Sequence, residues 1–316
     1  MKKRFSRAIF ISWYCAKGDC SFCWMSTQKN LIRDKEKALR SRQSVYAEAL
    51  ISKACGWDIE FLSCGSGSLL SDDLYEITKK IYEITGQKQW LNFGLIDENE
   101  LERLKPYTEG VTGTVECVNW QLREKLCPSK PVSDIIELFR HADRLGMKKA
   151  ITIIIGLGET INDYSNLKNF IMKHGIERIT FYSLNPHKGT PHNSSPDMDY
   201  YERWIAQTRS DFPGIRIIAG AWKDKTHYIP RLLAAGADFF TKLPALKIVG
   251  TKQGKEIDKM INMAGISQDE GLTDKPCIMI DENLFDETML LKVIDKIKRY
   301  GFTYRLAKSS GELLLR

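Results

Sequence analysis

The longest apolar run in the chain is Ile151-Thr-Ile-Ile-Ile155, and the turn Gly156-Leu-Gly-Glu159 follows it directly. A run of this length predicts a strand that is buried on both faces, as in a parallel sheet, rather than an alternating surface strand. Residues 132–145 before it and 161–174 after it have the apolar spacing of helices. The stretch therefore predicts a helix–strand–helix unit of an α/β fold.

The same alternation continues in both directions along the chain. We expect further strands at 8–12, 59–63, 90–93, 111–115, 179–182, 216–218 and 239–242, and further helices at 38–54, 71–85, 99–104, 200–210 and 229–235. Eight such strands, each followed by a helix or a turn, predict a (β/α)8 TIM-type barrel over residues 1–264. A strand at 276–280, a helix at 287–300 and a strand at 302–306 predict a short C-terminal α/β extension, residues 265–316, packed on the barrel.

Composition narrows the class of protein. The 316 residues are 43% hydrophobic, which is enough for a large core, and no stretch approaches the roughly 20 apolar residues that cross a bilayer. The net charge of +7 is spread along the chain without a block of like charges, and it fits either an acidic partner or solubility alone. We expect a soluble cytoplasmic protein that binds neither membrane nor nucleic acid.

Three of the eight cysteines lie close together, in Cys15-Ala-Lys-Gly-Asp-Cys20-Ser-Phe-Cys23, directly after the first expected strand. In a reducing compartment such a group indicates a metal site or catalysis rather than disulfides. The loop after a barrel strand lies at the end where barrels place their active sites. Three thiolates can hold a [4Fe–4S] cluster and leave one iron open, whereas zinc would require a fourth ligand nearby and the first histidine is His141.

The spacing Cys-x4-Cys-x2-Cys, with Phe22 before the third cysteine, resembles the signature of the radical SAM superfamily. This resemblance implies that the three cysteines hold a [4Fe–4S] cluster whose open iron binds S-adenosylmethionine. It also implies reductive cleavage to a 5′-deoxyadenosyl radical, with electrons from a protein such as ferredoxin, and that Phe22 packs beside the adenine.

Four later segments resemble biotin synthases in the order of that family, which places the barrel in the biotin synthase and lipoyl synthase branch. They are Gly156-Leu-Gly-Glu-Thr-Ile-Asn-Asp163, Lys188-Gly-Thr-Pro191, Arg216-Ile-Ile-Ala-Gly220 and Ala235-Gly-Ala-Asp238.

The resemblance also suggests binding residues for the cofactor. Ser63, Gly65 and Ser66 follow the second strand, where the family keeps a small polar stretch over the methionine moiety, and glycine allows close backbone approach. Glu116, ending the fourth strand, is expected to accept bonds from the ribose hydroxyls or the ammonium, because a carboxylate is expensive to bury unpaired.

Three further positions are candidates for the site. Glu159 either bonds the backbone of its own turn or contacts the ligand. Asn185 and Arg216 are expected at the ends of barrel strands, as candidate contacts for cofactor or substrate.

The chain also departs from biotin synthases, which hold a second cluster with three cysteines and an arginine. Only the arginine position is kept, as Arg216, and Leu62, Trp90 and Ala150 stand where that family has cysteines. A second iron–sulfur cluster is instead plausible on cysteines elsewhere in the chain: Cys64, Cys117, Cys127 and Cys277. The alternative is that several are ordinary buried thiols, as we expect for Cys55.

This mixture is most similar to the archaeal two-component lipoyl synthases. That resemblance implies sulfur insertion at an unactivated C–H bond of a protein-bound octanoyl group, with an octanoylated lipoyl-carrier protein and a second, related radical SAM subunit as partners. Two alternatives remain open. One is a biotin synthase-like enzyme, or a methylase or rearrangement enzyme that uses one cluster. The other is a non-catalytic iron–sulfur subunit.

Overall fold

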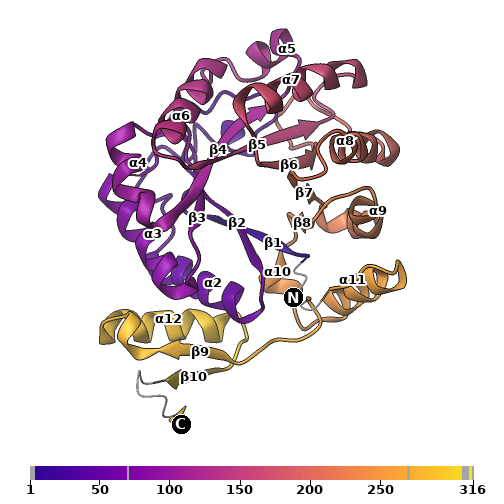
Figure 1. Ribbon diagram of the computed structural model, residues 1–316. Helices are drawn as coiled ribbons and strands as arrows, with labels where there is room; N and C mark the ends of the chain where they lie inside the picture. The colour runs from indigo at the N-terminus through magenta and orange to yellow at the C-terminus, as the bar shows by residue number, and fades with distance from the viewer. Residues whose placement is uncertain (1–3, 70, 269–270, 308–312, 315–316) are drawn as a thin grey trace.

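A computed structural model describes residues 4–69, 71–268, 271–307 and 313–314 (Figure 1). Eight strands form one parallel sheet in sequence order, curved into a ring with helices on its outside. They are β1 (Ser6–Phe10), β2 (Asp58–Ser63), β3 (Gln89–Asn92), β4 (Thr108–Glu116), β5 (Lys148–Ile155), β6 (Arg178–Ser183), β7 (Arg216–Gly220) and β8 (Phe239–Thr241). The predicted (β/α)8 barrel is therefore confirmed.

The ring is nearly closed, and its weakest joint lies between the first and last strands. Within the described residues, β1 and β8 are joined by a single isolated bridge, between Phe5 and Phe240. There the Phe240 amide donates to the Arg4 carbonyl oxygen at 2.7 Å, and the two phenyl rings pack with centroids 5.3 Å apart.

The helices that surround the ring include all those expected from the sequence. They are α1 (Trp24–Thr27), α2 (Arg42–Ala54), α3 (Ser71–Thr85), α4 (Glu98–Leu104), α5 (Trp120–Leu126), α6 (Val132–Arg144), α7 (Tyr164–His174), α8 (Met198–Asp211), α9 (Ile229–Ala234), α10 (Ala245–Ile248), α11 (Lys252–Met263) and α12 (Glu287–Arg299), with short 3-10 turns between some of them. Four of these, α1, α5, α10 and α11, were not expected. Helix α5 could have been predicted from Asn119, a residue type that often begins a helix. Its side chain accepts a hydrogen bond from the Leu122 amide at 3.1 Å, as an N-cap does.

The residues after α11 form a separate small layer on the outside of the ring. β9 (Ile278–Asp281) pairs in parallel with β10 (Tyr304–Ala307), and β10 pairs with β11 (Leu313–Leu314). Helix α12 lies along α2, and it buries Val293 and Ile297 completely (Figure 1). The extension is thus attached to the barrel wall beside the first strand.

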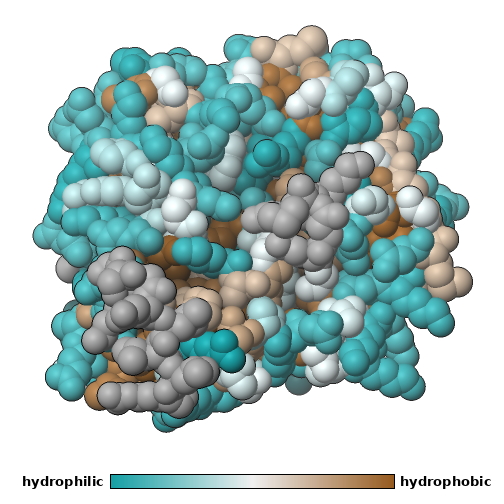
Figure 2. Space-filling model, turned by 60° about the horizontal axis from the view of Figure 1, so that its bottom comes forward, coloured by the Kyte–Doolittle hydropathy of each residue, from teal (hydrophilic) through white to brown (hydrophobic). Residues whose placement is uncertain are grey.

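Apolar side chains between the ring and its helices make one large core, and smaller clusters lie inside the barrel. On the outer face drawn in Figure 2, hydrophilic side chains dominate and hydrophobic ones appear in small separate patches. Among the described helices, none combines the length and the apolar composition that a membrane crossing requires.

Candidate active site

A cavity of about 710 Å³ opens at the C-terminal ends of the barrel strands, which is the mouth of the barrel. Its lining is mainly apolar, with Phe61, Ile135, Leu138 and Ile154 among the side chains that face it. Such a volume and lining are typical of sites that enclose a small organic molecule.

The three cysteines of the N-terminal loop all line this cavity. The loop leaves β1 and turns back on itself: the Gly18 amide donates to the Cys15 sulfur at 3.4 Å, and the Cys23 amide donates to the Cys20 carbonyl at 3.1 Å. Cys20 is buried and the other two are partly exposed. The loop therefore presents three sulfur atoms at the barrel mouth.

Contacts with the segment around α5 hold this loop from its other side. The Ser21 amide donates to the Leu126 carbonyl at 2.9 Å, and the Lys17 ammonium pairs with Asp134 at 3.2 Å. Ser129 donates to the Asp19 carboxylate. Because these contacts join the first and fourth βα loops, the position of the cysteines depends on both.

The loop after β2 packs directly against the cysteine loop, and Gly65 is the point of closest approach. A Cβ at Gly65 would lie 2.0 Å from the Tyr14 carbonyl oxygen and 2.6 Å from the Cys15 Cβ. The Ser68 hydroxyl donates to the Tyr14 carbonyl at 2.6 Å, and the Ala16 amide donates to the Ser66 carbonyl at 2.8 Å. Any larger residue at Gly65 would displace Cys15.

The donor set fits an iron–sulfur cluster. Burial raises the pKa of the Cys23 thiol, and a hydrogen bond with Cys127 together with burial raises that of Cys20, so these thiols are neutral until a metal displaces their protons. Among the described residues, no three His, Cys, Asp or Glu side chains lie close enough together to bind one metal ion. Ligands of a cubane bind different irons, so they need not converge on one point.

One further polar atom in the cavity is available to a ligand. The Thr112 hydroxyl lines the cavity and is buried, and no partner for it is found among the described residues. Buried polar atoms without a protein partner are rare, and those in cavities commonly serve a ligand.

Glu116 closes β4 with φ of +65°, a left-handed conformation that is uncommon outside glycine. Its carboxylate lines the cavity, pairs with Lys130 at 3.5 Å and accepts from the Thr152 hydroxyl at 3.3 Å. The residue is 8% exposed. A strained, buried carboxylate at the mouth is typical of a functional position.

The other expected cofactor residues fall into two groups. Phe22, Ser63, Gly65, Ser66 and Asn185 all line the same cavity as the cysteines. Glu159 does not line it: this carboxylate accepts from the Gly156 and Leu157 amides at 2.7 and 2.8 Å, so it serves its own turn, which is one of the two roles considered above.

Arg216 lies at the end of a barrel strand, as expected, but it does not line the cavity. It is the first residue of β7, so it lies at the end of the barrel away from the mouth, where its exposed guanidinium packs 5.7 Å from the Phe239 ring. Parallel strands all end at the mouth, so a residue that begins a strand is excluded from it. The strand predicted at 216–218 also begins at Arg216, so the sequence alone could have excluded this residue from the mouth.

Cys277 lies apart from the other cysteines considered for a second cluster. Cys64 lines the cavity near Cys15, and burial raises the pKa of its thiol to about 12. Cys117 and Cys127 lie in an apolar cluster with Cys20 and Phe22. Cys277 is exposed and immediately precedes β9, in the C-terminal extension. The proposed set of four therefore does not form one site.

An apolar cluster fills the barrel interior near the positions that hold cysteines in biotin synthases. It comprises Phe61, Trp90, Ala150 and Tyr182. Leu62 belongs instead to the outer core, so Phe61 rather than Leu62 takes the inward place on β2. Beside this cluster the buried Glu60 carboxylate accepts from the Thr241 hydroxyl at 2.6 Å and from the Tyr182 hydroxyl.

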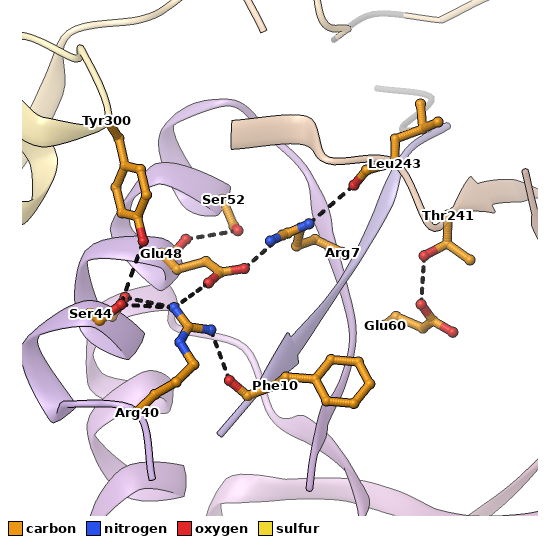
Figure 3. Close-up of polar contacts among 10 residues, drawn as sticks. All are labelled: Arg7, Phe10, Arg40, Ser44, Glu48, Ser52, Glu60, Thr241, Leu243 and Tyr300. Atoms are coloured by element: carbon orange, nitrogen blue, oxygen red, sulfur yellow. Dashed lines mark hydrogen bonds and ion pairs between the residues drawn. The ribbon is translucent and has the colours of Figure 1, made fainter. Parts of the chain in front are cut away.

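A charged network that was not predicted from the sequence joins β1, α2 and the segment after β8 (Figure 3). Glu48, whose side chain is 1% exposed, pairs with Arg7 at 2.6 Å and with Arg40 at 2.7 Å. Arg7 also donates to the Leu243 carbonyl at 3.2 Å, and Arg40 donates to the Phe10 carbonyl at 2.8 Å. The network therefore ties together the two strands at the weak joint of the ring.

Comparisons with known proteins agree with this site. The family model "Radical SAM superfamily" matches residues 11–171, just over half of the chain. An uncharacterized protein of Methanocaldococcus jannaschii is 41% identical over 264 residues, which is 83% of this chain and 73% of that protein.

Biotin synthases are more distant relatives in sequence. Biotin synthases of Clostridium botulinum and Methanococcus aeolicus are 27% and 25% identical over 61% and 54% of this chain. The alignments span 62% and 53% of those proteins, less than two thirds of their length.

Among solved structures, methylornithine synthase superposes with a TM-score of 0.62 at 17% identity, covering 96% of this chain and 84% of that one. This likeness concerns the fold. Three observations agree: the family match, the relative in M. jannaschii and the cysteine loop at the barrel mouth. The chain belongs to the radical SAM superfamily, as a distant relative of biotin synthases.

Proposed function

We propose that this radical SAM enzyme inserts sulfur at an unactivated C–H bond of an octanoyl group carried on a protein, as a lipoyl synthase component. The observation that carries the proposal is the mainly apolar cavity of about 710 Å³, which encloses a cysteine outside the trio, Cys64. Its lining suits an aliphatic chain, and Cys64 offers a thiol ligand for a second cluster, the sulfur source, beside that chain. The sequence relation to biotin synthases supports the same class of reaction.

In this proposal Cys15, Cys20 and Cys23 hold a [4Fe–4S] cluster, which together with S-adenosylmethionine supplies a 5′-deoxyadenosyl radical. Phe22, Ser63, Ser66 and Asn185 border the cofactor side of the cavity. The apolar side chains at 61, 135, 138 and 154 hold the aliphatic chain and exclude water, which protects a radical from side reactions. An octanoylated carrier domain, a related second subunit and a reducing protein such as ferredoxin are the proposed partners, and the cytoplasm the proposed location.

The test is to reconstitute the protein anaerobically, count iron and sulfide per chain, and incubate it with S-adenosylmethionine, dithionite and an octanoylated lysine peptide. We expect about eight irons, since sulfur insertion needs a second cluster as sulfur source, and a peptide mass increase from added sulfur. Cys64→Ala should abolish the thiolated product, whereas Cys277→Ala, outside the cavity, should not. About four irons without thiolated peptide would refute the proposal.

A second candidate function is a one-cluster methylase or rearrangement enzyme. The interior cluster of Phe61, Trp90, Ala150 and Tyr182 favours it, because the described residues that form this cluster are apolar and include no thiol. Its expected result is four irons, 5′-deoxyadenosine formation, and full activity of the Cys64→Ala variant. A non-catalytic subunit would form no 5′-deoxyadenosine at all.

A further inference from the structure

Lys242 directly follows β8 and faces the cavity. Its φ is +73°, and among the non-glycine residues of the described chain only Glu116 shares a left-handed backbone. Such conformations are unfavourable for residues with a side chain, persist only where the surroundings impose them, and gather at binding and catalytic sites. Both strained residues end a barrel strand at the mouth, and they carry opposite charges.

The two residues that flank Lys242 in the chain are each held by a hydrogen bond (Figure 3). Before it, the Thr241 hydroxyl donates to the buried Glu60 carboxylate at 2.6 Å. After it, the Leu243 carbonyl accepts from Arg7, and Glu48 in turn holds Arg7 at 2.6 Å. The strained conformation is thus maintained by two buried acidic groups, one on β2 and one on α2.

Aromatic rings surround the Lys242 ammonium. It lies 4.5 Å from the centroid of Tyr182, 5.4 Å from Phe10 and 5.9 Å from Trp222. Gly220 leaves room for this arrangement, because a Cβ there would lie 2.6 Å from the Tyr182 ring and 3.4 Å from the Lys242 stem. Rings fix the position of a cation but offer it no hydrogen-bond acceptor.

The other charged groups of the cavity already have partners. Glu116 pairs with Lys130 at 3.5 Å, and Lys17 pairs with Asp134 at 3.2 Å. For Lys242, by contrast, the described part of the chain provides neither a hydrogen bond nor an ion pair. Burial lowers the pKa of Lys242, although Glu60 and Glu116 oppose this. A partly desolvated ammonium with three free donors requires an oxygen acceptor.

We propose that Lys242 binds the acyl oxygen of the substrate, the carboxylate or carbonyl at the polar end of an aliphatic chain. The choice of an acyl chain rests on the proposed function, whereas the need for an oxygen acceptor rests on the geometry of Lys242. With the polar end fixed at β8, the apolar part of the chain extends among Phe61, Leu138 and Ile154, and the carbon that reacts is set by its distance from that anchor.

Calorimetric titration of the anaerobically reconstituted holoenzyme, with S-adenosylmethionine present, tests this proposal. The probes are octanoate, which offers a carboxylate, and an octanoylated lysine peptide, which offers a carbonyl. Lys242→Met and Lys242→Gln should weaken binding of at least one probe by about tenfold or more, the usual effect of losing a hydrogen bond from a charged donor. The probe that responds identifies the source of the oxygen. Lys242→Arg, which keeps the charge, should bind better than either neutral variant.

Lys247→Met is the matched control, because Lys247 lies on α10 and is exposed. It should bind both probes as the unmodified enzyme does, and S-adenosylmethionine affinity should be unchanged in all variants. Three results would each overturn the proposal. The folded neutral variants could bind both probes as well as the unmodified enzyme, or they could lose only affinity for S-adenosylmethionine. The unmodified enzyme itself could fail to bind either probe. Since these are binding measurements, absence of thiolated product would refute the proposed function without affecting them.

Discussion

Gly65 is the residue at which the two loops of the cofactor site come into contact. Its neighbours on the opposite loop are the Tyr14 carbonyl and the Cys15 side chain, both closer to an added Cβ than atoms tolerate. The sequence predicted a glycine with close backbone approach at this position, but it assigned the close contact to a ligand. The structure shows that the cysteine loop itself is what approaches.

Gly65→Ala should therefore lower the iron content of the reconstituted protein, because Cys15 must move. We expect a loss of about 1–3 kcal/mol of stability from the overpacking as well. Colorimetric iron assay and thermal melting would measure the two effects. Gly214→Ala is the control, since Gly214 has ordinary φ and no atom within 4 Å of an added Cβ; an equal iron loss in both variants would contradict this reading.

The cysteines of the N-terminal loop have a separate prediction. Cys15→Ala, Cys20→Ala and Cys23→Ala should each remove the cluster that binds S-adenosylmethionine, so about four irons per chain are lost. Cys277→Ala should keep all the iron, because Cys277 is exposed in the C-terminal extension. Iron and sulfide assays, with 5′-deoxyadenosine formation as a second readout, decide the matter. A Cys23→Ala variant that still cleaves S-adenosylmethionine would be incompatible with this assignment.

At the scale of elements, the barrel strands were predictable because each is a short apolar run that parallel pairing buries on both faces, as β6 illustrates. The site was predictable only where neighbouring residues in sequence define it, as in the loop from Cys15 to Cys23. Lys242 was not recognised, because its significance depends on a left-handed backbone and on rings from β1, β6 and the loop after β7. Single residues in a sequence do not reveal either property.

Helix α2 carries the centre of the buried charged network, and Glu48→Ala should destabilise the protein strongly. Removing the carboxylate leaves Arg7 and Arg40 without their shared partner, which costs about 3 kcal/mol for a buried pair. Denaturant unfolding of the reconstituted protein would measure the change. Glu256→Ala is the control: its pair with Lys252 spans 3.8 Å on the exposed side of α11, where less than about 1 kcal/mol is expected.

For the whole molecule, the question is whether barrel and extension unfold together. Ile297 of α12 is fully buried in the shared core, whereas Leu291 on the same helix is 61% exposed. Ile297→Ala should cost about 2–5 kcal/mol and lower the midpoint of a single transition, while Leu291→Ala should change it little. Calorimetry would detect both. A separate early transition in Ile297→Ala, with an unchanged main one, would show instead that the extension unfolds alone.

The single bridge between Phe5 and Phe240 has a consequence for how the protein is made. The strand that leads to the cysteine loop is synthesised well before its neighbour β8, which is among the last parts of the barrel to be made. Contacts between segments so distant in sequence form late in folding. The segment that carries the cysteines is therefore synthesised before β8 can close the barrel beside it. Until the ring closes, these thiols depend on the reducing power of their surroundings.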